Sequence, residues 1–336
     1  MRDDRWTATA WIASILLCCA LVTGCQASGT ARPEATGGEA PHASVADARY
    51  DYAVYPLERN GHALHLDRMV VEGTEPERQI LLVHGVTYST HEFDIDYEDY
   101  SLVRRLAREG YAVWRLDITG FGQSEEIEDG FLPDTDYAAE DINAAVEAIV
   151  AESGAERVDV LGWSWGTVTT GRFAARHPEH LGRLVLYAPI LMGLGEGTVT
   201  EPFHHNTWEH AVEDFQKDQS GAIDYTIVDP VVVELYCSSC WHFDGESSPN
   251  GGRRDLFVPT SQRLIDLSAI TVPTLIICGD NDGYLDMDQI AAGIDELPEG
   301  SALEVINGAS HVAYLEEPYH RDFQDALVRF LGGAES

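Results

Sequence analysis

The sequence alternates short, continuously apolar runs with longer amphipathic stretches, and this alternation limits the folds open to it. Apolar runs of strand type lie at residues 80–83, 111–117, 157–161, 184–187, 274–278 and 302–306. Stretches with helical periodicity separate them, at residues 98–109, 135–152, 165–176, 286–296 and 319–330. Strands that are apolar on both sides are buried on both faces, so the pattern predicts an α/β fold with a mostly parallel, twisted sheet covered by helices.

An antiparallel hairpin is expected before the first of these runs. Residues 50–57 and 62–71 resemble two strands, and Glu58-Arg59-Asn60-Gly61 joins them. Asn-Gly between two such runs is a strong hairpin signal, because these two residues adopt positive φ at low cost. The helix at 135–152 is expected to begin at an N-cap supplied by Asp136 or Thr135.

The alternation breaks once, between residues 191 and 263, after the sixth expected strand. This stretch is rich in histidine, contains two tryptophans and includes a Ser-Ser-Pro-Asn-Gly-Gly loop. We interpret it as an insertion that forms a cap over the C-terminal edge of the sheet. The catalytic core is then predicted to consist of residues 49–190 and 264–335.

The N-terminus has the features of an export signal. An apolar run from Trp11 to Val22 follows two arginines. It is about 12 residues long, too short to span a bilayer as a helix, which needs about 20 residues. The run ends in Leu-Val-Thr-Gly-Cys, which resembles a bacterial lipobox with Cys25 as the lipidated residue. We therefore predict a lipoprotein signal peptide at residues 1–24.

Residues 25–48 are small and polar, and they cannot bury enough apolar surface to order themselves, so they are predicted to be a flexible tether. The predicted location is the outer face of a bacterial membrane, with Cys25 as the lipid anchor. An ordinary secretory signal is the alternative, and it would give a secreted or periplasmic protein. The sequence does not predict an oligomeric state.

The charge balance excludes one class of partner. The chain has 57 acidic and 21 basic residues, a formal net charge of −36. Such a chain is repelled by the phosphates of nucleic acids, so DNA or RNA binding is not expected. The charge predicts a strongly solvated surface and a bias against anionic substrates such as free fatty acids.

The strongest chemical signal is Gly162-Trp163-Ser164-Trp165-Gly166. It lies between an expected strand and an expected helix, which is the context of a nucleophile elbow. The turn presents the Ser164 hydroxyl at the sheet edge. The flanking glycines are required because strand and helix pass too closely for side chains, and the helix directs its first amides at the reaction centre.

A serine nucleophile needs a base and an acid to orient that base. His311, in Gly-Ala-Ser-His after the last strand, is the histidine placed for this role. Asp282 follows the strand at 274–278 with the better spacing for the acid, and Asp280 is the alternate. Whichever of the two is not the acid is expected to form a turn. The order Ser, Asp, His is that of the α/β-hydrolases.

From Tyr50 to its C-terminus the chain resembles the α/β-hydrolase superfamily, so the expected fold is the α/β-hydrolase fold. The resemblance includes His84-Gly85 at the end of the third strand and the loop Asp-Ile-Thr-Gly-Phe-Gly-Gln-Ser at residues 117–124. It implies that the backbone N–H groups of Val86 and Trp165 form the oxyanion hole. It also implies that His84 is a hydrogen-bonded structural residue, while the Trp165 indole either walls the acyl pocket or packs in the core.

The function expected from these motifs is acyl transfer by a serine hydrolase acting on a small-molecule carboxylic ester, with no metal or cofactor. The second hypothesis is an amide or lactone hydrolase, such as a proline-releasing aminopeptidase. Acidic residues of the cap would then hold the substrate amine. A non-catalytic, ligand-binding lipoprotein is the third.

Two further groups of residues have weaker signals. The cap histidines His204, His205 and His210 could hold a metal, but packing or exposed histidines are the preferred interpretation. Cys237 and Cys240 lie in a stretch expected to be irregular, and a local disulfide is preferred over a free or metal-bound pair.

Overall fold

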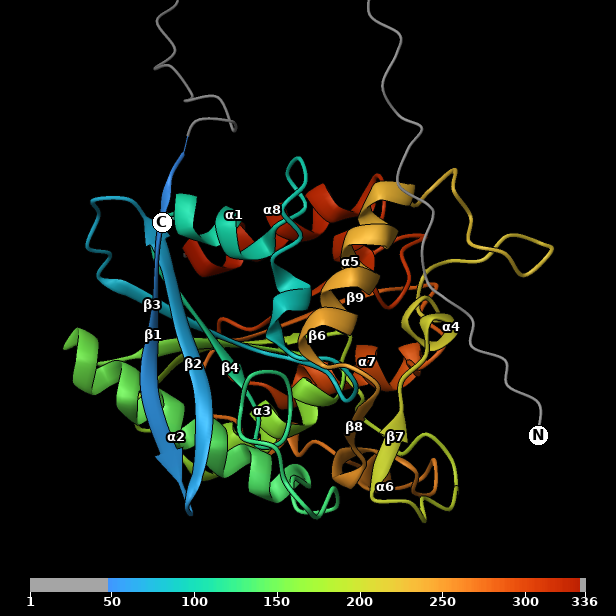
Figure 1. The fold of residues 1–336 in the computed structure, drawn as a ribbon, viewed down its shortest axis with the longest axis horizontal. Helices are drawn as coiled ribbons and strands as arrows, with labels where there is room; N and C mark the ends of the chain where they lie inside the picture. The colour runs from blue at the N-terminus through green and yellow to red at the C-terminus, as the bar shows by residue number, and fades with distance from the viewer. Residues whose placement is uncertain (1–47, 333–336) are drawn as a thin grey trace, which may run out of the picture. The chain divides into compact units, whose positions relative to one another are not determined.

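A computed structural model describes residues 48–332 of the chain, and its main sheet has eight strands in the order β1-β2-β4-β3-β5-β6-β9-β10 (Figure 1). The strands are β1 (Tyr50–Arg59), β2 (His62–Val71), β3 (Arg78–Val83), β4 (Tyr111–Asp117), β5 (Val158–Trp163), β6 (Leu181–Tyr187), β9 (Thr274–Gly279) and β10 (Ala302–Ile306). The β1–β2 and β2–β4 pairs are antiparallel, and all other neighbours are parallel. The predicted mostly parallel sheet is confirmed.

The hairpin between β1 and β2 turns where the sequence predicts. Asn60 has φ 53° and Gly61 has φ 84°. Positive φ at both central residues is the geometry of a type I′ turn, which matches the twist of the strands it joins.

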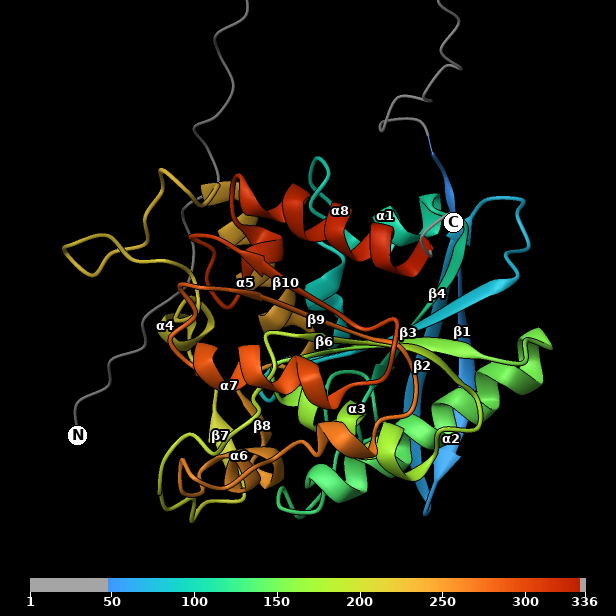
Figure 2. The ribbon, with the colours of Figure 1, turned by 180° about the vertical axis from the view of Figure 1, so that it is seen from behind.

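Helices cover both faces of the sheet (Figures 1 and 2). The side chains of Ile80 and Leu82 in β3 pack on the same side as α1 (Leu102–Arg108) and α8 (Tyr319–Gly332). The alternate residues Leu81 and Val83 pack on the opposite side. That second face is covered by α2 (Thr135–Ser153), α3 (Trp165–Arg176) and α7 (Met287–Gly293). The alternation of buried side chains along β3 therefore builds two separate cores.

Some helix ends differ from those expected. Helix α1 begins at Leu102 rather than near residue 98, because Glu98 adopts φ 46° and the Ser101 hydroxyl caps the helix by accepting the Arg104 N–H. Helix α2 is capped by Asp134, one residue before the two candidates, since its carboxylate accepts the Tyr137 N–H.

The stretch between residues 191 and 263 adds no strand to the main sheet. It contains β7 (Phe203–His205), α4 (Trp208–Ala211), α5 (Pro230–Phe243), β8 (Ser247–Pro249) and α6 (Gly251–Leu256). Strands β7 and β8 pair with each other in a small antiparallel sheet. We keep the name cap for residues 191–263, and its boundaries stay a prediction.

The two neighbouring cap cysteines are helical and reduced. Cys237 and Cys240 lie in α5 rather than in an irregular stretch, and both are free thiols, so the preferred disulfide is not present. The physical reason is the helix: residues three apart on a helix have Cβ atoms about 5–6 Å apart, whereas a disulfide needs about 3.5–4.5 Å. Both side chains are buried in the apolar core. Burial raises the pKa of the Cys237 thiol to about 12, which keeps it protonated.

The signal peptide, Cys25 and all but the last residue of the predicted tether lie outside residues 48–332. Within the described part of the chain, the helices are too short or too polar for any of them to cross a membrane.

The junction of β5 and α3 brings backbone against backbone. A Cβ atom added to Gly162 would lie 2.2 Å from the Gly166 carbonyl oxygen, and one added to Gly166 would lie 2.5 Å from the His84 carbonyl oxygen. Real Cβ atoms do not approach backbone oxygens this closely. Both glycines are therefore required by the crossing of strand, helix and the end of β3.

We expect Gly162→Ala to lower the free energy of unfolding by about 1–3 kcal/mol, the usual cost of overpacking, because helix α3 must shift away from β5. Urea denaturation of the protein measures this free energy of unfolding. Gly332→Ala is the matched control, since its added Cβ meets no atom within 4 Å. Equal stability of the two variants would contradict the requirement for glycine at 162.

Candidate active site

Ser164 occupies the turn between β5 and α3 in a strained backbone conformation. Its φ is 56° and its ψ is −122°, values that a non-glycine residue rarely adopts. Its N–H donates to the Tyr187 carbonyl oxygen of β6 at 3.0 Å, which ties the turn to the neighbouring strand. The 12-residue helix α3 starts directly after it, so the positive end of the helix dipole lies at the serine.

His311 and Asp282 are brought together from two separate loops. The carboxylate oxygen Oδ2 of Asp282, after β9, accepts a hydrogen bond of 2.7 Å from Nδ1 of His311, after β10. The second carboxylate oxygen accepts the Tyr284 N–H at 2.9 Å. Burial lowers the pKa of His311, but the charge of Asp282 and its hydrogen bond outweigh burial and raise it above 6.5. Asp282 thus orients the imidazole and favours its protonated form.

Two aromatic residues hold the backbone of His311, and the sequence motifs did not reveal their role. The Trp163 indole N–H and the Tyr187 hydroxyl both donate to the His311 carbonyl oxygen, at 3.1 and 2.9 Å. The Trp163 ring also lies against the imidazole, with centroids 5.3 Å apart. Trp163 therefore links the turn at Ser164 directly to His311.

The two expected oxyanion donors are free. Within residues 48–332, neither the Val86 N–H nor the Trp165 N–H donates to another protein atom. His84 is fully buried, accepts the Ile118 N–H at Nε2 and contacts the Gly85 carbonyl oxygen through Nδ1. This pair of contacts requires the proton on Nδ1, and burial lowers the pKa of His84, so it is a neutral structural residue.

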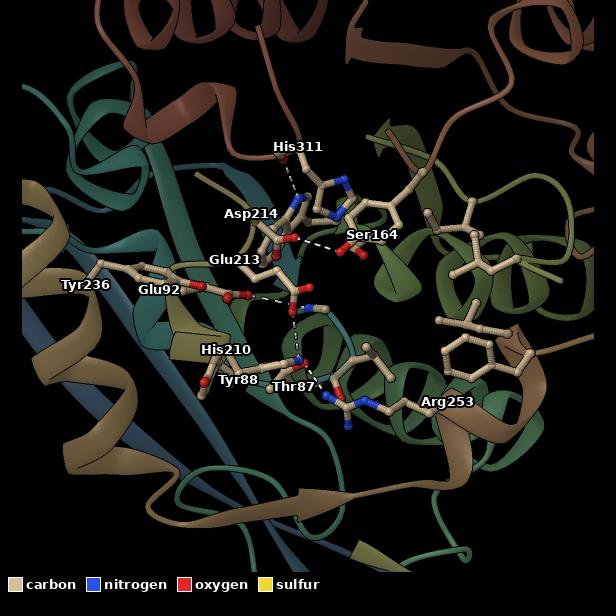
Figure 3. A pocket seen from close by; sticks show the side chains of 18 residues that line it. Thr87, Tyr88, Glu92, Ser164, His210, Glu213, Asp214, Tyr236, Arg253 and His311 are labelled. Carbon is tan, nitrogen blue, oxygen red and sulfur yellow. Dashed lines mark hydrogen bonds and ion pairs between the residues drawn. The ribbon is translucent and has the colours of Figure 1, made fainter. Parts of the chain in front are cut away.

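Ser164 and His311 face a common cavity of about 300 Å³ (Figure 3). No hydrogen bond joins their side chains in the described structure, although the imidazole lies beside the serine. The core contributes residues from the loop after β3, the nucleophile turn and the loops after β6, β9 and β10, and the cap contributes the remaining wall. The cap residues are His210, Glu213, Asp214, Tyr236, Arg253, Leu256 and Phe257, together with Leu194.

The carboxyl groups of this cavity differ in their partners. Burial raises the pKa of Glu92 well above its ordinary value, which favours its neutral form, and it accepts the Gly85 N–H at 3.4 Å. Asp214 accepts the Tyr284 hydroxyl at 3.0 Å. Glu213 lies 3.8 Å from His210 Nε2. Two carboxyl groups of the cap and one of the core thus line the cavity.

Other expected residues take non-catalytic positions. Asp280, the alternate acid, accepts the Gly308 N–H at 2.6 Å and shapes the loop before His311. The Trp165 indole does not line the cavity; it is buried and donates to Thr135 at 3.1 Å. The rings of His204 and His210 lie 4.5 Å apart. Within residues 48–332, no group of three potential ligands is placed to hold a metal.

The sheet order, the elbow serine and the Asp282–His311 pair together define an α/β-hydrolase. The chain belongs to the family described as "Serine aminopeptidase, S33", which matches residues 74–318. The protein is therefore a hydrolase of this family.

Individual relatives act on different compounds. The chain is 29% identical to a 2-hydroxy-6-oxononadienedioate/2-hydroxy-6-oxononatrienedioate hydrolase of Pseudomonas putida, over 65% of this chain and 77% of that one. It is 29% identical to a proline iminopeptidase of Elizabethkingia meningoseptica, over 34% of this chain and 36% of that one. The crystal structure of a bromoperoxidase from Bacillus anthracis shares the fold, with TM-score 0.59 and 19% identity over 84% of this chain and all of that one.

We expect kcat/KM to rise with pH through a midpoint above 6.5, because a base must be neutral and the pKa of His311 is raised. In Asp282→Asn the charge that raises this pKa is gone while burial, which lowers it, stays. The acidic limb therefore moves to lower pH, and kcat falls by about 10⁴-fold, as when the orienting acid of a triad is lost.

A pH–rate profile of both proteins measures the shift. Asp280→Asn is the control, because Asp280 contacts only the loop backbone. An unchanged midpoint in Asp282→Asn, with the fold intact, would show that another group sets the titration.

Proposed function

We propose that this hydrolase cleaves carboxylic esters through an acyl-enzyme intermediate on Ser164. The observation that carries the proposal is the 2.7 Å hydrogen bond between Asp282 and His311 beside a strained elbow serine on one cavity. Serine alone is a poor nucleophile, and this arrangement supplies the base and its orienting acid.

Each group has a defined task in the proposed reaction. His311 Nε2 removes the Ser164 proton as the hydroxyl oxygen attacks the ester carbonyl carbon, and it then donates that proton to the leaving alcohol. Asp282 stabilises the imidazolium through Nδ1. The free N–H groups of Val86 and Trp165 bind the oxyanion, each contributing about 3–4 kcal/mol by comparison with similar donors. Water, deprotonated by His311, then releases the acid and regenerates the serine.

We expect a fluorophosphonate probe to label the wild-type protein covalently at Ser164, because the probe reacts with serines activated by a neighbouring base. Ser164→Ala should show no labelling. Thr167→Ser is a suitable control, since this hydroxyl donates to the Ser164 carbonyl oxygen and is not placed to act as a nucleophile. A wild-type protein that stays unlabelled would favour the non-catalytic, ligand-binding alternative.

An amide hydrolase that releases an N-terminal residue is the second candidate. The family description supports it, and so do Glu213 and Asp214, because two carboxylates in the cavity wall could bind a substrate ammonium group. Of the other acidic cap residues, Glu201 and Glu209 do not line the cavity.

The two candidates differ in their preferred substrates. We expect p-nitrophenyl esters of short and medium acids to be hydrolysed with at least about tenfold higher kcat/KM than proline p-nitroanilide, because no amine-binding site is needed for an ester. A spectrophotometric assay of released nitrophenol and nitroaniline distinguishes the two candidate functions. Turnover of the anilide without the esters would overturn ester hydrolysis in favour of the peptidase.

Export and lipid attachment at Cys25 stay predictions from the sequence, because the residues concerned lie outside the described structure.

A further inference from the structure

Arg253 is a buried cation in the wall of the proposed active-site cavity. It lies in α6 of the cap, is 8% exposed and lines the same cavity as Ser164 and His311. Figure 3 shows its guanidinium group directed into the cavity, toward Thr87. The cap therefore contributes a positive charge to the wall of this cavity.

All hydrogen-bond acceptors of this guanidinium group are neutral. Nη1 donates to the Val86 carbonyl oxygen at 3.2 Å, to Asn250 at 3.3 Å and to Ser248 at 3.5 Å, and Nη2 donates to the Thr87 hydroxyl. Arg253 forms no ion pair with any carboxylate of residues 48–332. Its hydrogen bonds thus all go to neutral groups, and the charge of Asp214 acts on it only without direct contact.

The other arginine that is buried within residues 48–332, Arg115, is paired with a carboxylate, and so is the partly buried Arg59. Arg115 forms a bidentate pair with Asp67 at 2.8 and 2.9 Å, and Arg59 is paired with the fully buried Asp141. A buried guanidinium group without a carboxylate loses hydration that nothing replaces fully, and burial accordingly lowers the pKa of Arg253 to about 10.

The charge of Arg253 also reaches its neighbours. Burial first, and then the charge of Arg253, lowers the pKa of His204 to about 4 and lowers that of His210 as well. Both imidazoles are therefore neutral near pH 7, so they add no second cation to the cavity. The carboxylate of Asp214, which lines the same cavity, accepts the Tyr284 hydroxyl rather than a guanidinium N–H.

We propose that Arg253 binds a carboxylate of the substrate, so that the preferred esters carry a carboxylate near the carbonyl that Ser164 attacks. The planar guanidinium group is suited to this, because its parallel N–H groups match the two oxygens of a carboxylate. Its contact with the Val86 carbonyl oxygen places the bound carboxylate beside the loop after β3, which we call the oxyanion loop because it carries the proposed Val86 donor. This substrate class rests on the proposed ester hydrolysis at Ser164.

The kinetic test compares two esters of equal chain length and identical leaving group: p-nitrophenyl hemiadipate, which carries a carboxylate, and p-nitrophenyl hexanoate, which does not. In Arg253→Gln we expect kcat/KM for the hemiadipate to fall about 10- to 100-fold, as for loss of a charged hydrogen bond, and that for the hexanoate to change less than about threefold. Arg253→Lys retains the charge without the planar guanidinium group, so its kcat/KM for the hemiadipate should lie between those of the wild type and Arg253→Gln.

The matched control is Arg254→Gln on the same helix. It removes one positive charge from the surface, where Arg254 lies 3.6 Å from Asp134, and should leave the ratio of the two esters unchanged. Equal losses for both esters in Arg253→Gln and Arg253→Lys would overturn the proposal and leave Arg253 with a structural role at the Val86 carbonyl.

A binding measurement separates this proposal from the proposed function. Isothermal titration of adipate into Ser164→Ala needs no catalysis, and we expect binding that Ser164→Ala/Arg253→Gln lacks and that adipamide, the uncharged diamide, does not show. Failure of fluorophosphonate labelling would remove ester hydrolysis but leave adipate binding intact. Labelling without any binding of adipate would overturn the carboxylate site alone.

Discussion

The close crossing of β5, α3 and the end of β3 is the constraint on which the site depends. Because Gly162 and Gly166 bring backbone against backbone, the chain must turn at Ser164 with positive φ. That turn presents the hydroxyl outside the sheet edge and the first amide of α3 beside it. The same crossing brings the loop after β3 next to the serine, since a Cβ on Gly85 would lie 3.5 Å from the Ser164 Cβ atom. One steric requirement thus positions the proposed nucleophile and both proposed oxyanion donors.

The sequence predicted those parts of the structure that depend on local pattern. Three elements have the expected bounds or geometry: the strand at 302–306, the helix at 165–176 and the Asn60-Gly61 turn. They could be predicted because the spacing of apolar residues and the residue types of a turn depend only on neighbours in the sequence. Ser164, Asp282 and His311 could be selected because each follows a strand of a parallel sheet, and the carboxyl ends of such strands meet at one edge.

The features that sequence reasoning missed depend on contacts between distant segments. Trp163 and Tyr187 come from adjacent strands and hold the carbonyl of His311, which is 148 and 124 residues away. Nothing in the motif around Ser164 distinguishes a tryptophan with this task from one that packs, as Trp165 does. The start of α1 was also missed, because helical periodicity extends to residues whose backbone, as at Glu98, turns the other way.

Arg253 changes how the net charge relates to function. A surface with net charge −36 disfavours anions at long range, but this repulsion is screened over about 8–10 Å at physiological salt. Inside the cavity, the nearest charged groups have the larger effect on binding, because partly buried charges are screened less by salt than exposed ones. Composition alone therefore could not predict the sign of a bound substrate. The same guanidinium group contacts the Val86 carbonyl oxygen of the proposed oxyanion loop. A carboxylate bound to Arg253 would thus be held by a residue that also links the cap to this loop.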